Sequence, residues 1–198
     1  MCGNQIRTIL LTGGIGSGKS AVAGILRSKG IPVYDCDASA KNVYERNPGV
    51  VARLESLLGV SLRGSDGSFS RKALADIIFK DSASLSAVES VVHPAVLEDF
   101  MRWRSSQNAP VVAIESAIAK EKPLFQGLWD AVVVVTAPLE QRLERVMARD
   151  GMKSEDVIAR IKAQNTSVLG AGAVINNDCG MAALEERTSL ALKILNIQ

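Results

Sequence analysis

Histidine, cysteine and net charge are all scarce in this chain of 198 residues, and each scarcity excludes a class of function. The single histidine, His93, makes a metal site built from several histidines impossible. The formal net charge is only +2 and lysines and arginines form no long run, so no nucleic-acid partner is expected. The cysteines lack metal-binding or redox spacing and are expected to be free thiols; they are Cys2, Cys36 and Cys179.

Long hydrophobic runs are also missing, although hydrophobic residues make up 47% of the chain and suffice for a core. The most apolar run, around residues 132–135, has the length of a strand and is far shorter than the about 20 residues that cross a bilayer. At the N-terminus a short apolar run leads straight into a glycine-rich loop, which is not the layout of a signal peptide. We therefore expect a soluble cytoplasmic protein with no membrane partner and no evident obligate protein partner.

The most informative segment that is present, residues 13–20, reads Gly-Gly-Ile-Gly-Ser-Gly-Lys-Ser and has the spacing of a P-loop. Glycines allow several backbone N–H groups to converge on one anion, and the helix that follows adds its own unpaired N–H groups. Lys19 supplies a positive charge to the β- and γ-phosphates, and the Ser20 hydroxyl can bind Mg²⁺. Because an apolar strand pattern precedes the loop and a helical pattern follows it, we favour triphosphate binding over a merely flexible turn.

Strand and helix patterns alternate along most of the chain, which predicts an α/β fold with a parallel, doubly wound sheet. In such a sheet, ligands bind at the carboxyl ends of the strands. The expected strands are residues 6–11, 31–35, 111–114, 131–136 and 174–175. Outside the block described next, the expected helices begin near residues 19, 38, 138, 154 and 181, and the fourth of these, capped by Ser154, ends near Asn165.

A helix-rich block at about residues 48–106 interrupts this alternation and is expected to be a subdomain inserted over the substrate. One helix would begin at Pro48 and end near Leu58, and Ser70 would cap a second that ends near Phe79. A third would begin near Asp81 and end before His93, and Pro94 would open a fourth that ends near residue 105.

Asp35 and Asp37 follow the second expected strand, whose end lies close to the P-loop in this architecture. A carboxylate there can accept the proton of an attacking hydroxyl or hold Mg²⁺ through water. If the strand extends to Asp37, alternation places both carboxylates on the same side. Alternatively, Asp37 caps the helix that follows, a role that does not exclude catalysis.

Three arginines at spacings of three and four residues share one face of an expected helix; they are Arg142, Arg145 and Arg149. On a mobile helical lid they could meet the charge of a transferring phosphoryl group and exclude water. The alternative is a solvated face paired with Glu140 and Glu144. We favour a function for Arg149, which lies beside a helix break at Gly151.

Two further motifs are ambiguous on residue chemistry alone. His93-Pro94 is more typical of a structural turn, and the amides of Asn176-Asn177 are more typical of an Asx turn than of a purine site. A GTPase is disfavoured because no guanine-reading Asn-Lys-x-Asp segment and no Asp-x-x-Gly switch motif is present. A small kinase acting on a metabolite remains.

The assembled motifs resemble those of the dephospho-coenzyme A kinase family over nearly the whole chain. The P-loop version Thr-Gly-Gly-Ile-Gly-Ser-Gly-Lys-Ser is much more specific than the general pattern. Two positions depart from the family, because Ala21 replaces a second hydroxyl residue and Lys120 replaces an aromatic before Glu121. The other matching motifs are Asp35-x-Asp37, His93-Pro94, Arg145-x-x-x-Arg149-Asp150, Gln164 and Ile175-x-Asn177.

The resemblance implies transfer of the γ-phosphate of ATP, with Mg²⁺, to the ribose 3′-hydroxyl of dephospho-CoA, the last step of coenzyme A synthesis. It also implies a three-layer P-loop kinase fold, in one domain over residues 1–198. The core would comprise residues 1–47, 107–137 and 166–198, with a helical CoA-binding subdomain at about 48–106 and a helical lid at about 138–165. Another small-metabolite or nucleotide kinase, or a non-catalytic ATP-binding module, is the alternative.

The resemblance also assigns roles to residues. Asp37 would be the base near the 3′-hydroxyl, and Lys19 and Arg149 would stabilise the transferring phosphoryl group. His93 and Glu121, with Asp37, would lie on the dephospho-CoA side, and Ser20 would bind Mg²⁺. The residues expected to bind ATP are Gly14, Gly16, Ser17, Gly18, Lys19, Ser20, Ala21 and, near the adenine, Asn177.

Overall fold

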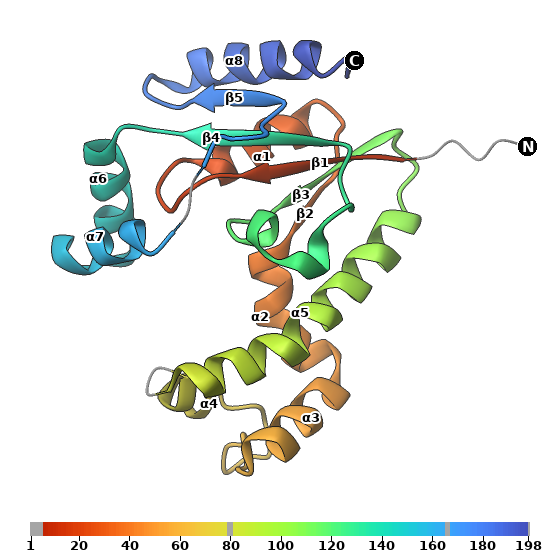
Figure 1. Ribbon diagram of the computed structural model, residues 1–198, viewed down its shortest axis with the longest axis vertical. Coiled ribbons are helices and arrows are strands. Elements are labelled where there is room, and N and C mark those ends of the chain that lie inside the picture. Colours follow the sequence, from red (N-terminus) through yellow and green to blue (C-terminus); the bar gives the residue numbers. More distant parts are fainter. Residues whose placement is uncertain (1–5, 79–80, 165–166, 198) are drawn as a thin grey trace, which may run out of the picture. The chain divides into compact units, whose positions relative to one another are not determined.

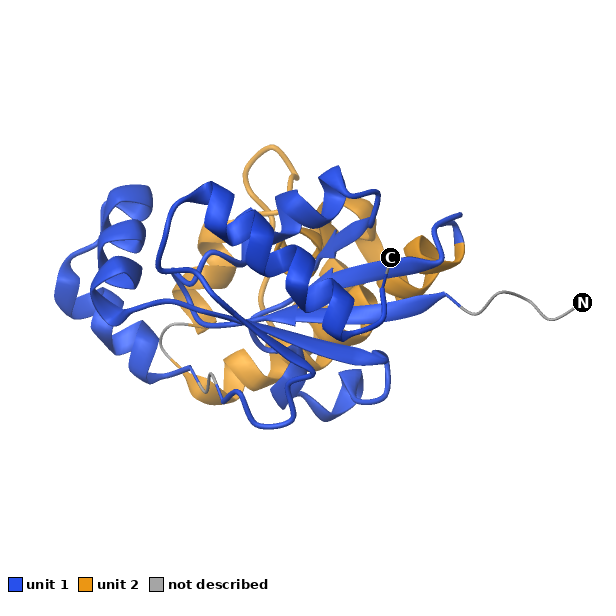
Figure 2. Ribbon diagram, turned by 90° about the horizontal axis from the view of Figure 1, so that it is seen from above, with its two compact units in different colours: residues 1–35, 106–198 blue, residues 36–105 orange. Residues whose placement is uncertain are grey.

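A computed structural model of the chain describes residues 6–78, 81–164 and 167–197 and divides it into two compact units. The first, here called the core unit, comprises Met1–Asp35 and Ser106–Gln198, and the second, the helical unit, is Cys36–Ser105 (Figure 2). The helical unit is therefore inserted between two segments of the core unit.

The core unit is built on a sheet of five parallel strands, which lie in the order β2-β3-β1-β4-β5 (Figure 1). Interior strands of a parallel sheet are covered on both faces, which explains the almost continuous burial of β1, β3 and β4. The parallel α/β fold expected from the alternating patterns is confirmed. The strands are β1 (Arg7–Thr12), β2 (Val33–Asp35), β3 (Val111–Glu115), β4 (Ala131–Thr136) and β5 (Ala173–Asn176).

Two helices of the core unit, α1 (Lys19–Ser28) and α8 (Met181–Ile194), pack against each other and against the sheet. Val22, Ile25 and Leu26 of α1 are buried in this core, as their helical spacing predicts. The other helical segments of this unit are η1 (Ala119–Glu121), η2 (Pro123–Phe125), α6 (Leu139–Asp150) and α7 (Ser154–Lys162).

The helical unit is organised around its longest helix, α5 (Ser82–Ser105), which packs against α2 (Cys36–Arg46), α3 (Pro48–Leu58) and α4 (Arg71–Ile78). Phe100 of α5 is fully buried. The side chain of Asn47 accepts a hydrogen bond from the Gly49 amide and caps α3, in which Pro48 is the first residue. Ser70 caps α4 in the same way through the Ala73 amide, as expected.

The expectation of two helices meeting at Pro94 is wrong, because α5 runs without a break through His93 and Pro94. A proline inside a helix removes one backbone hydrogen bond and costs about 3 kcal/mol. A buried apolar stripe continues across this position and offsets that cost; its members are Val88, Val91, Val92, Val96 and Phe100. His93 is therefore a residue of a helix and not of a turn.

The condition under which strand alternation would place Asp35 and Asp37 on the same side, a strand that reaches Asp37, is not met. The strand ends at Asp35, and α2 begins at Cys36, so Asp37 lies in the first turn of a helix. A negative charge in the first turn of a helix is favourable, which suits an aspartate at this position. Strand alternation consequently says nothing about where the Asp37 carboxylate points.

The structure also tests the expectations for a helix cap, the cysteines and membrane-spanning segments. The expectation that Ser154 caps α7 is wrong, because Lys153 occupies the N-cap position and Ser154 is already the first residue of the helix. Within the described residues, the buried Cys36 and the exposed Cys179 form no disulfide, as expected. Cys2 and the expected helix ends at Phe79 and Asn165 lie outside the described residues. Within the ranges that the structure describes, no helix is both long enough and apolar enough to cross a membrane.

Candidate nucleotide-binding site

The P-loop joins the carboxyl end of β1 to the first turn of α1, and its shape depends on its glycines. Gly18 has a φ of 93°, a left-handed conformation that glycine adopts without strain. A Cβ at this position would lie 2.0 Å from the side-chain nitrogen of Asn177. A Cβ at Gly16 would lie 2.5 Å from the Arg142 carbonyl oxygen. Glycine is therefore required at both positions by conformation and by space.

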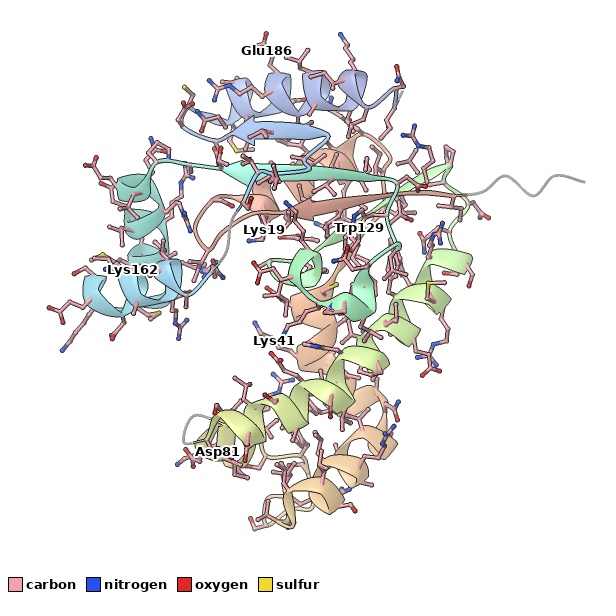
Figure 3. All side chains as sticks on the ribbon, in the orientation of Figure 1. Lys19, Lys41, Asp81, Trp129, Lys162 and Glu186 are labelled. Atoms are coloured by element: carbon pink, nitrogen blue, oxygen red, sulfur yellow. The ribbon has the colours of Figure 1, made fainter. Side chains whose placement is uncertain are left out.

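Backbone donors and one lysine face the space above this loop. Among the described residues, no acceptor is found for the backbone N–H groups of Gly16 and Gly18. Lys19, labelled in Figure 3, is the first residue of α1, and its ammonium donates to the carbonyls of Gly13 (2.9 Å) and Gly14 (3.3 Å). The ammonium is thus held over the loop, where it adds to the positive end of the helix dipole. This arrangement is suited to an anion.

The hydroxyl of Ser20 donates a hydrogen bond to a carboxylate oxygen of Glu115, 2.9 Å away. Glu115 ends β3, the strand beside β1, and it is only 7% exposed. Burial raises the pKa of the Glu115 carboxyl above its usual range, the Ser20 hydrogen bond lowers it, and the charge of Asp35 raises it further. Asp35 ends β2 and pairs in register with Glu115, so two carboxylates gather at this edge of the sheet.

Glu115 was missed as a candidate in the sequence. The available signal was an acidic residue that ends an apolar strand, in the way that Asp35 ends the strand before it. Few protein oxygen ligands lie beside Ser20 at this end of the sheet. The described part of the chain holds no cluster of three or more histidine, cysteine, aspartate or glutamate side chains that could bind a metal. Any cation at this edge must therefore complete its coordination with ligand oxygens and water.

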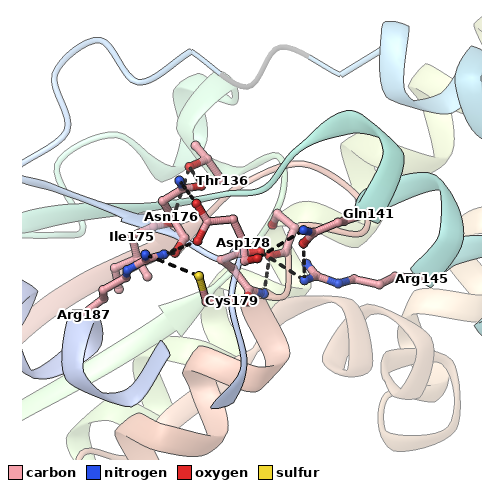
Figure 4. A network of polar contacts seen from close by, with 10 residues as sticks. Thr136, Gln141, Arg145, Ile175, Asn176, Asp178, Cys179 and Arg187 are labelled. Carbon is pink, nitrogen blue, oxygen red and sulfur yellow. Dashed lines mark hydrogen bonds and ion pairs between the residues drawn. The ribbon is translucent and has the colours of Figure 1, made fainter. Parts of the chain in front are cut away.

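Side chains from α6 hold the outer side of the P-loop. The Arg142 guanidinium donates to the Ile15 carbonyl (2.9 Å), and Arg145 donates to the Gly16 carbonyl (3.3 Å). Arg145 also donates to the side chain of Gln141 and to the Asn177 carbonyl, as Figure 4 shows in part. In this structure, two of the three predicted arginines therefore support the loop itself.

Two amide side chains complete this support, and both belong to motifs that carried the resemblance. The Gln164 side chain accepts a hydrogen bond from the Ile15 amide (2.7 Å). The Asn177 side chain donates to the Ser17 carbonyl (2.9 Å), and Asn177 is itself buried. The P-loop backbone is thus fixed by residues that follow it by more than 120 positions in the sequence.

Arg149, the arginine favoured from the sequence, lies elsewhere. Its guanidinium makes two hydrogen bonds to the neighbouring Asp150 carboxylate, at 2.7 and 2.8 Å, and 63% of its side chain is exposed. That pairing raises the pKa of Arg149. Its partner is therefore Asp150, and neither Glu140 nor Glu144, the partners considered in the sequence. A role for Arg149 at the phosphates stays a prediction.

The remaining candidates are spread over both units. Asp37 and His93 belong to the helical unit, and their position relative to the P-loop stays a prediction. Glu121 is an exposed residue of η1. Beside it, Lys120 donates to the carbonyls of Ser167 and Leu169, so this departure from the family pattern ties down the segment that precedes β5.

The second departure, Ala21, packs against the hydrophobic core of the core unit, and its amide donates to the Gly18 carbonyl. An apolar side chain suits this surrounding. The loop therefore closes without the second hydroxyl that many members of the resembled family have.

The sheet order and the P-loop at the end of its central strand give the chain the fold of the P-loop kinases. Shikimate kinase from Bacteroides thetaiotaomicron has this fold, with a TM-score of 0.55 at 12% identity, over 96% of this chain and 99% of that one. The family model described as Dephospho-CoA kinase matches residues 7–183, and the chain belongs to that family.

Individual relatives agree with this assignment. The dephospho-CoA kinase of Porphyromonas gingivalis is 44% identical over 157 residues, which are 79% of this chain and 77% of that protein. The crystal structure of TT1252 from Thermus thermophilus superposes with a TM-score of 0.83 at 37% identity and covers 98% of both chains. Membership of the family makes the chain an ATP-dependent phosphotransferase with dephospho-CoA kinase activity. This activity is the final step of coenzyme A biosynthesis.

Proposed function

We propose that the chain transfers the γ-phosphoryl group of MgATP to the ribose 3′-hydroxyl of dephospho-CoA by means of the residues named below. The observation that carries this proposal is the P-loop of a family member with Lys19 held over it and Ser20 hydrogen-bonded to a buried carboxylate. Phosphoryl transfer depends mainly on positioning and on charge stabilisation, and a braced loop with fixed donors supplies both.

The ATP phosphates bind to the backbone of the P-loop. The N–H groups of Gly16 and Gly18, for which the described residues provide no acceptor, support this role, and Lys19 exchanges its carbonyl partners for phosphate oxygens. Asn177 lies near the adenine, and its bond to Ser17 also keeps the loop in shape. The full ATP-binding set proposed is Gly14, Gly16, Ser17, Gly18, Lys19, Ser20, Ala21 and Asn177.

The residues beside the P-loop fit Mg²⁺, which prefers hard oxygen ligands and keeps several waters. The Ser20 hydroxyl and the Glu115 carboxylate already lie within 2.9 Å of each other, and they would hold the ion directly or through water. When bound, Mg²⁺ neutralises charge on the phosphate oxygens. Asp35 would keep the local potential negative before the ion arrives.

Asp37 serves as the base. Its carboxylate accepts the proton of the 3′-hydroxyl, the 3′-oxygen forms a bond to the γ-phosphorus, and the bond from that phosphorus to the β–γ bridging oxygen breaks to release ADP. Lys19 and Arg149 stabilise the charge of the transferring group. His93 and Glu121 contact the acceptor. An exposed first-turn position leaves the Asp37 carboxylate accessible for this role.

A panel of acceptors tests the proposal. Purified protein is supplied with MgATP and, in separate reactions, dephospho-CoA, a nucleoside monophosphate, shikimate and no acceptor. Efficient ADP formation with dephospho-CoA alone is expected. Preferred turnover of another acceptor would favour another small-metabolite kinase, and ATP binding without turnover of any acceptor would favour a non-catalytic ATP-binding module.

A further inference from the structure

A short loop, residues 177–180, connects the carboxyl end of β5 to the start of α8, and we call it the β5–α8 loop. Because β1, β4 and β5 are parallel, this loop leaves the sheet at the same edge as the P-loop, the edge at which such sheets bind ligands. The hydrogen bond from Asn177 to the Ser17 carbonyl places the two loops side by side. The β5–α8 loop is therefore a neighbour of any nucleotide that the P-loop holds.

Three consecutive backbone carbonyls at the end of β5 and in this loop each accept a hydrogen bond from a side chain of a helix (Figure 4). The donors are the side chains of Arg187 to the Asn176 carbonyl, of Arg145 to the Asn177 carbonyl (3.0 Å) and of Gln141 to the Asp178 carbonyl (3.2 Å). Because two of these donors belong to α6 and one to α8, the loop backbone is fixed by two separate helices.

Arg187 makes further contacts with the same loop. Its guanidinium also donates to the Asp178 carboxylate and lies 3.8 Å from the Cys179 sulfur. The hydrogen bond between Arg187 and Asp178 lowers the pKa of the aspartate and raises the pKa of the arginine, so both stay charged at physiological pH. The planar fork of a guanidinium holds several acceptors in a fixed geometry. Arg187 thus joins α8 to the end of β5 and to two residues of the loop.

The loop retains backbone donors for a ligand. Among the described residues, no acceptor is found for the N–H groups of Cys179 and Gly180. Space is open beside Gly180, because a Cβ built there would meet no described atom within 4 Å beyond its chain neighbours. With three carbonyls already bonded to side chains, the β5–α8 loop is suited to donate to a base and not to accept from it.

A donor of this kind distinguishes adenine from guanine only if it cannot move. The ring nitrogen at position 1 accepts a hydrogen bond in adenine and donates one in guanine, and at position 6 these roles are reversed. A fixed N–H group opposite position 1 pairs with adenine and meets another N–H group in guanine, which leaves both donors unsatisfied. A loop that is free to shift reaches the guanine oxygen at position 6 instead. Selectivity for adenine therefore requires a held loop.

We propose that Arg187 is a positioning residue for the choice of the nucleotide base, an inference that rests on the proposed function. By holding the Asn176 carbonyl and Asp178, it keeps the N–H groups of the β5–α8 loop where adenine pairs and guanine does not. Arg187 itself touches no substrate. A purely structural role would change stability, or the use of ATP and GTP alike, whereas a positioning role changes the ratio between the two nucleotides.

Amide hydrogen exchange of the wild type tests whether the loop contacts the base. Exchange is followed by NMR spectroscopy with Mg²⁺ and either a non-hydrolysable ATP analogue or tripolyphosphate, which has the phosphates and lacks the base. The ATP analogue should slow exchange of the Cys179 or Gly180 amide at least about tenfold, and tripolyphosphate should not. Equal slowing by both ligands, or slowing by neither, overturns the inference.

Arg187→Met tests the positioning role, because it keeps the length of the side chain and removes its donors. Arg7→Met is the matched control: Arg7 also donates to two backbone carbonyls, those of Leu195 and Asn196 (3.2 and 3.3 Å), at the other end of α8. The measured quantity is the ratio of kcat/KM for ATP to kcat/KM for GTP, with dephospho-CoA as acceptor. The wild type should favour ATP at least about 100-fold, and Arg187→Met should lower this ratio at least about tenfold, the effect of about one hydrogen bond to a charged group.

Arg7→Met should leave the ratio within about twofold of wild type, and the KM for dephospho-CoA should stay within about twofold in both variants. A folded Arg187→Met protein with an unchanged ratio overturns the inference, and so does an equal loss of activity with both nucleotides. Circular dichroism shows whether the variant is folded. If it is not, Gln141→Met removes the donor to the Asp178 carbonyl and should lower the same ratio.

The proposed function is tested separately by the wild type. Wild-type protein that phosphorylates dephospho-CoA with ATP and GTP equally well contradicts only the role of Arg187. Wild-type protein that does not phosphorylate dephospho-CoA with either nucleotide contradicts the proposed function. If both variants are unfolded, the exchange measurement on the wild type decides.

Discussion

The side-chain amide of Asn177 donates a hydrogen bond to the Ser17 carbonyl, 2.9 Å away, and so joins the end of β5 to the P-loop. The same amide nitrogen would lie 2.0 Å from a Cβ at Gly18. Loop and amide therefore require each other: the glycine makes room for the amide, and the amide satisfies a loop carbonyl. Four side chains from the second half of the chain hydrogen-bond to the P-loop backbone in this way; they are Arg142, Arg145, Gln164 and Asn177.

The first prediction follows from that bond. Asn177→Leu leaves the Ser17 carbonyl without its donor, and an unsatisfied buried polar group costs about 1–3 kcal/mol. We expect a lower melting temperature and a KM for ATP raised about tenfold or more. Asn176→Leu is the control, because the Asn176 side chain is exposed and bonds to Asp178 and not to the loop. Equal KM values for ATP in the two variants would contradict the role given to Asn177.

Glu115 gives a second prediction, on the metal. Glu115→Gln keeps the shape of the side chain and removes the charge that would attract Mg²⁺. The Mg²⁺ concentration for half-maximal rate should rise about 10- to 100-fold, the usual effect of disturbing a metal's surroundings. Glu186→Gln, on the exposed side of α8 (Figure 3), should leave the Mg²⁺ dependence unchanged. An unchanged dependence in Glu115→Gln would place the metal elsewhere.

The raised pKa of Glu115 gives a third prediction, on pH. A carboxyl whose pKa is higher in the folded state than in the unfolded state stabilises the fold below its unfolded pKa, and this contribution is lost as the pH rises through the folded pKa. Wild-type protein without Mg²⁺ should therefore lose stability relative to Glu115→Gln as the pH rises from 4 to 8. Urea unfolding of both proteins across this range measures the difference. If wild type instead gained stability relative to Glu115→Gln as the pH rises, burial would not be the dominant influence on the pKa of Glu115.

Asp37 gives the fourth prediction. Asp37→Asn removes the proton acceptor, and kcat should fall about 10²- to 10⁴-fold, while the KM for ATP is nearly kept. Asp76→Asn, at an exposed aspartate on α4 to which no role is assigned, is the control. Steady-state kinetics with both substrates provide the measurement. A kcat close to that of wild type would reduce Asp37 to a first-turn charge that stabilises α2.

The fold and the P-loop could be predicted because local rules determine them. Glycine spacing, the apolar run before the loop and the helical spacing of Val22, Ile25 and Leu26 are all visible within about 20 residues, and the structure confirms the elements they predict. Helix starts marked by Pro48 and Ser70 were equally accessible, since capping is a local interaction.

What could not be predicted depends on packing between distant segments. Pro94 carries a strong local signal for a helix start, and the buried stripe of α5 overrides it. In the sequence, Glu115 is only the end of an apolar strand. Its contact with Ser20 depends on the pairing of β3 with β1, which the sequence alone does not reveal. Spacing groups Arg142, Arg145 and Arg149 on one helix face, but only the packing of α6 reveals which of them reach the P-loop.

The central claim is that this chain places a phosphate on the 3′-oxygen of dephospho-CoA. The most direct measurement is to incubate purified protein with MgATP and dephospho-CoA, and to locate the added phosphate in the product by ³¹P NMR spectroscopy and mass spectrometry. We predict equal amounts of ADP and of coenzyme A phosphorylated at the 3′-position. No product from this acceptor, together with efficient phosphorylation of a nucleotide or a sugar, would contradict the account.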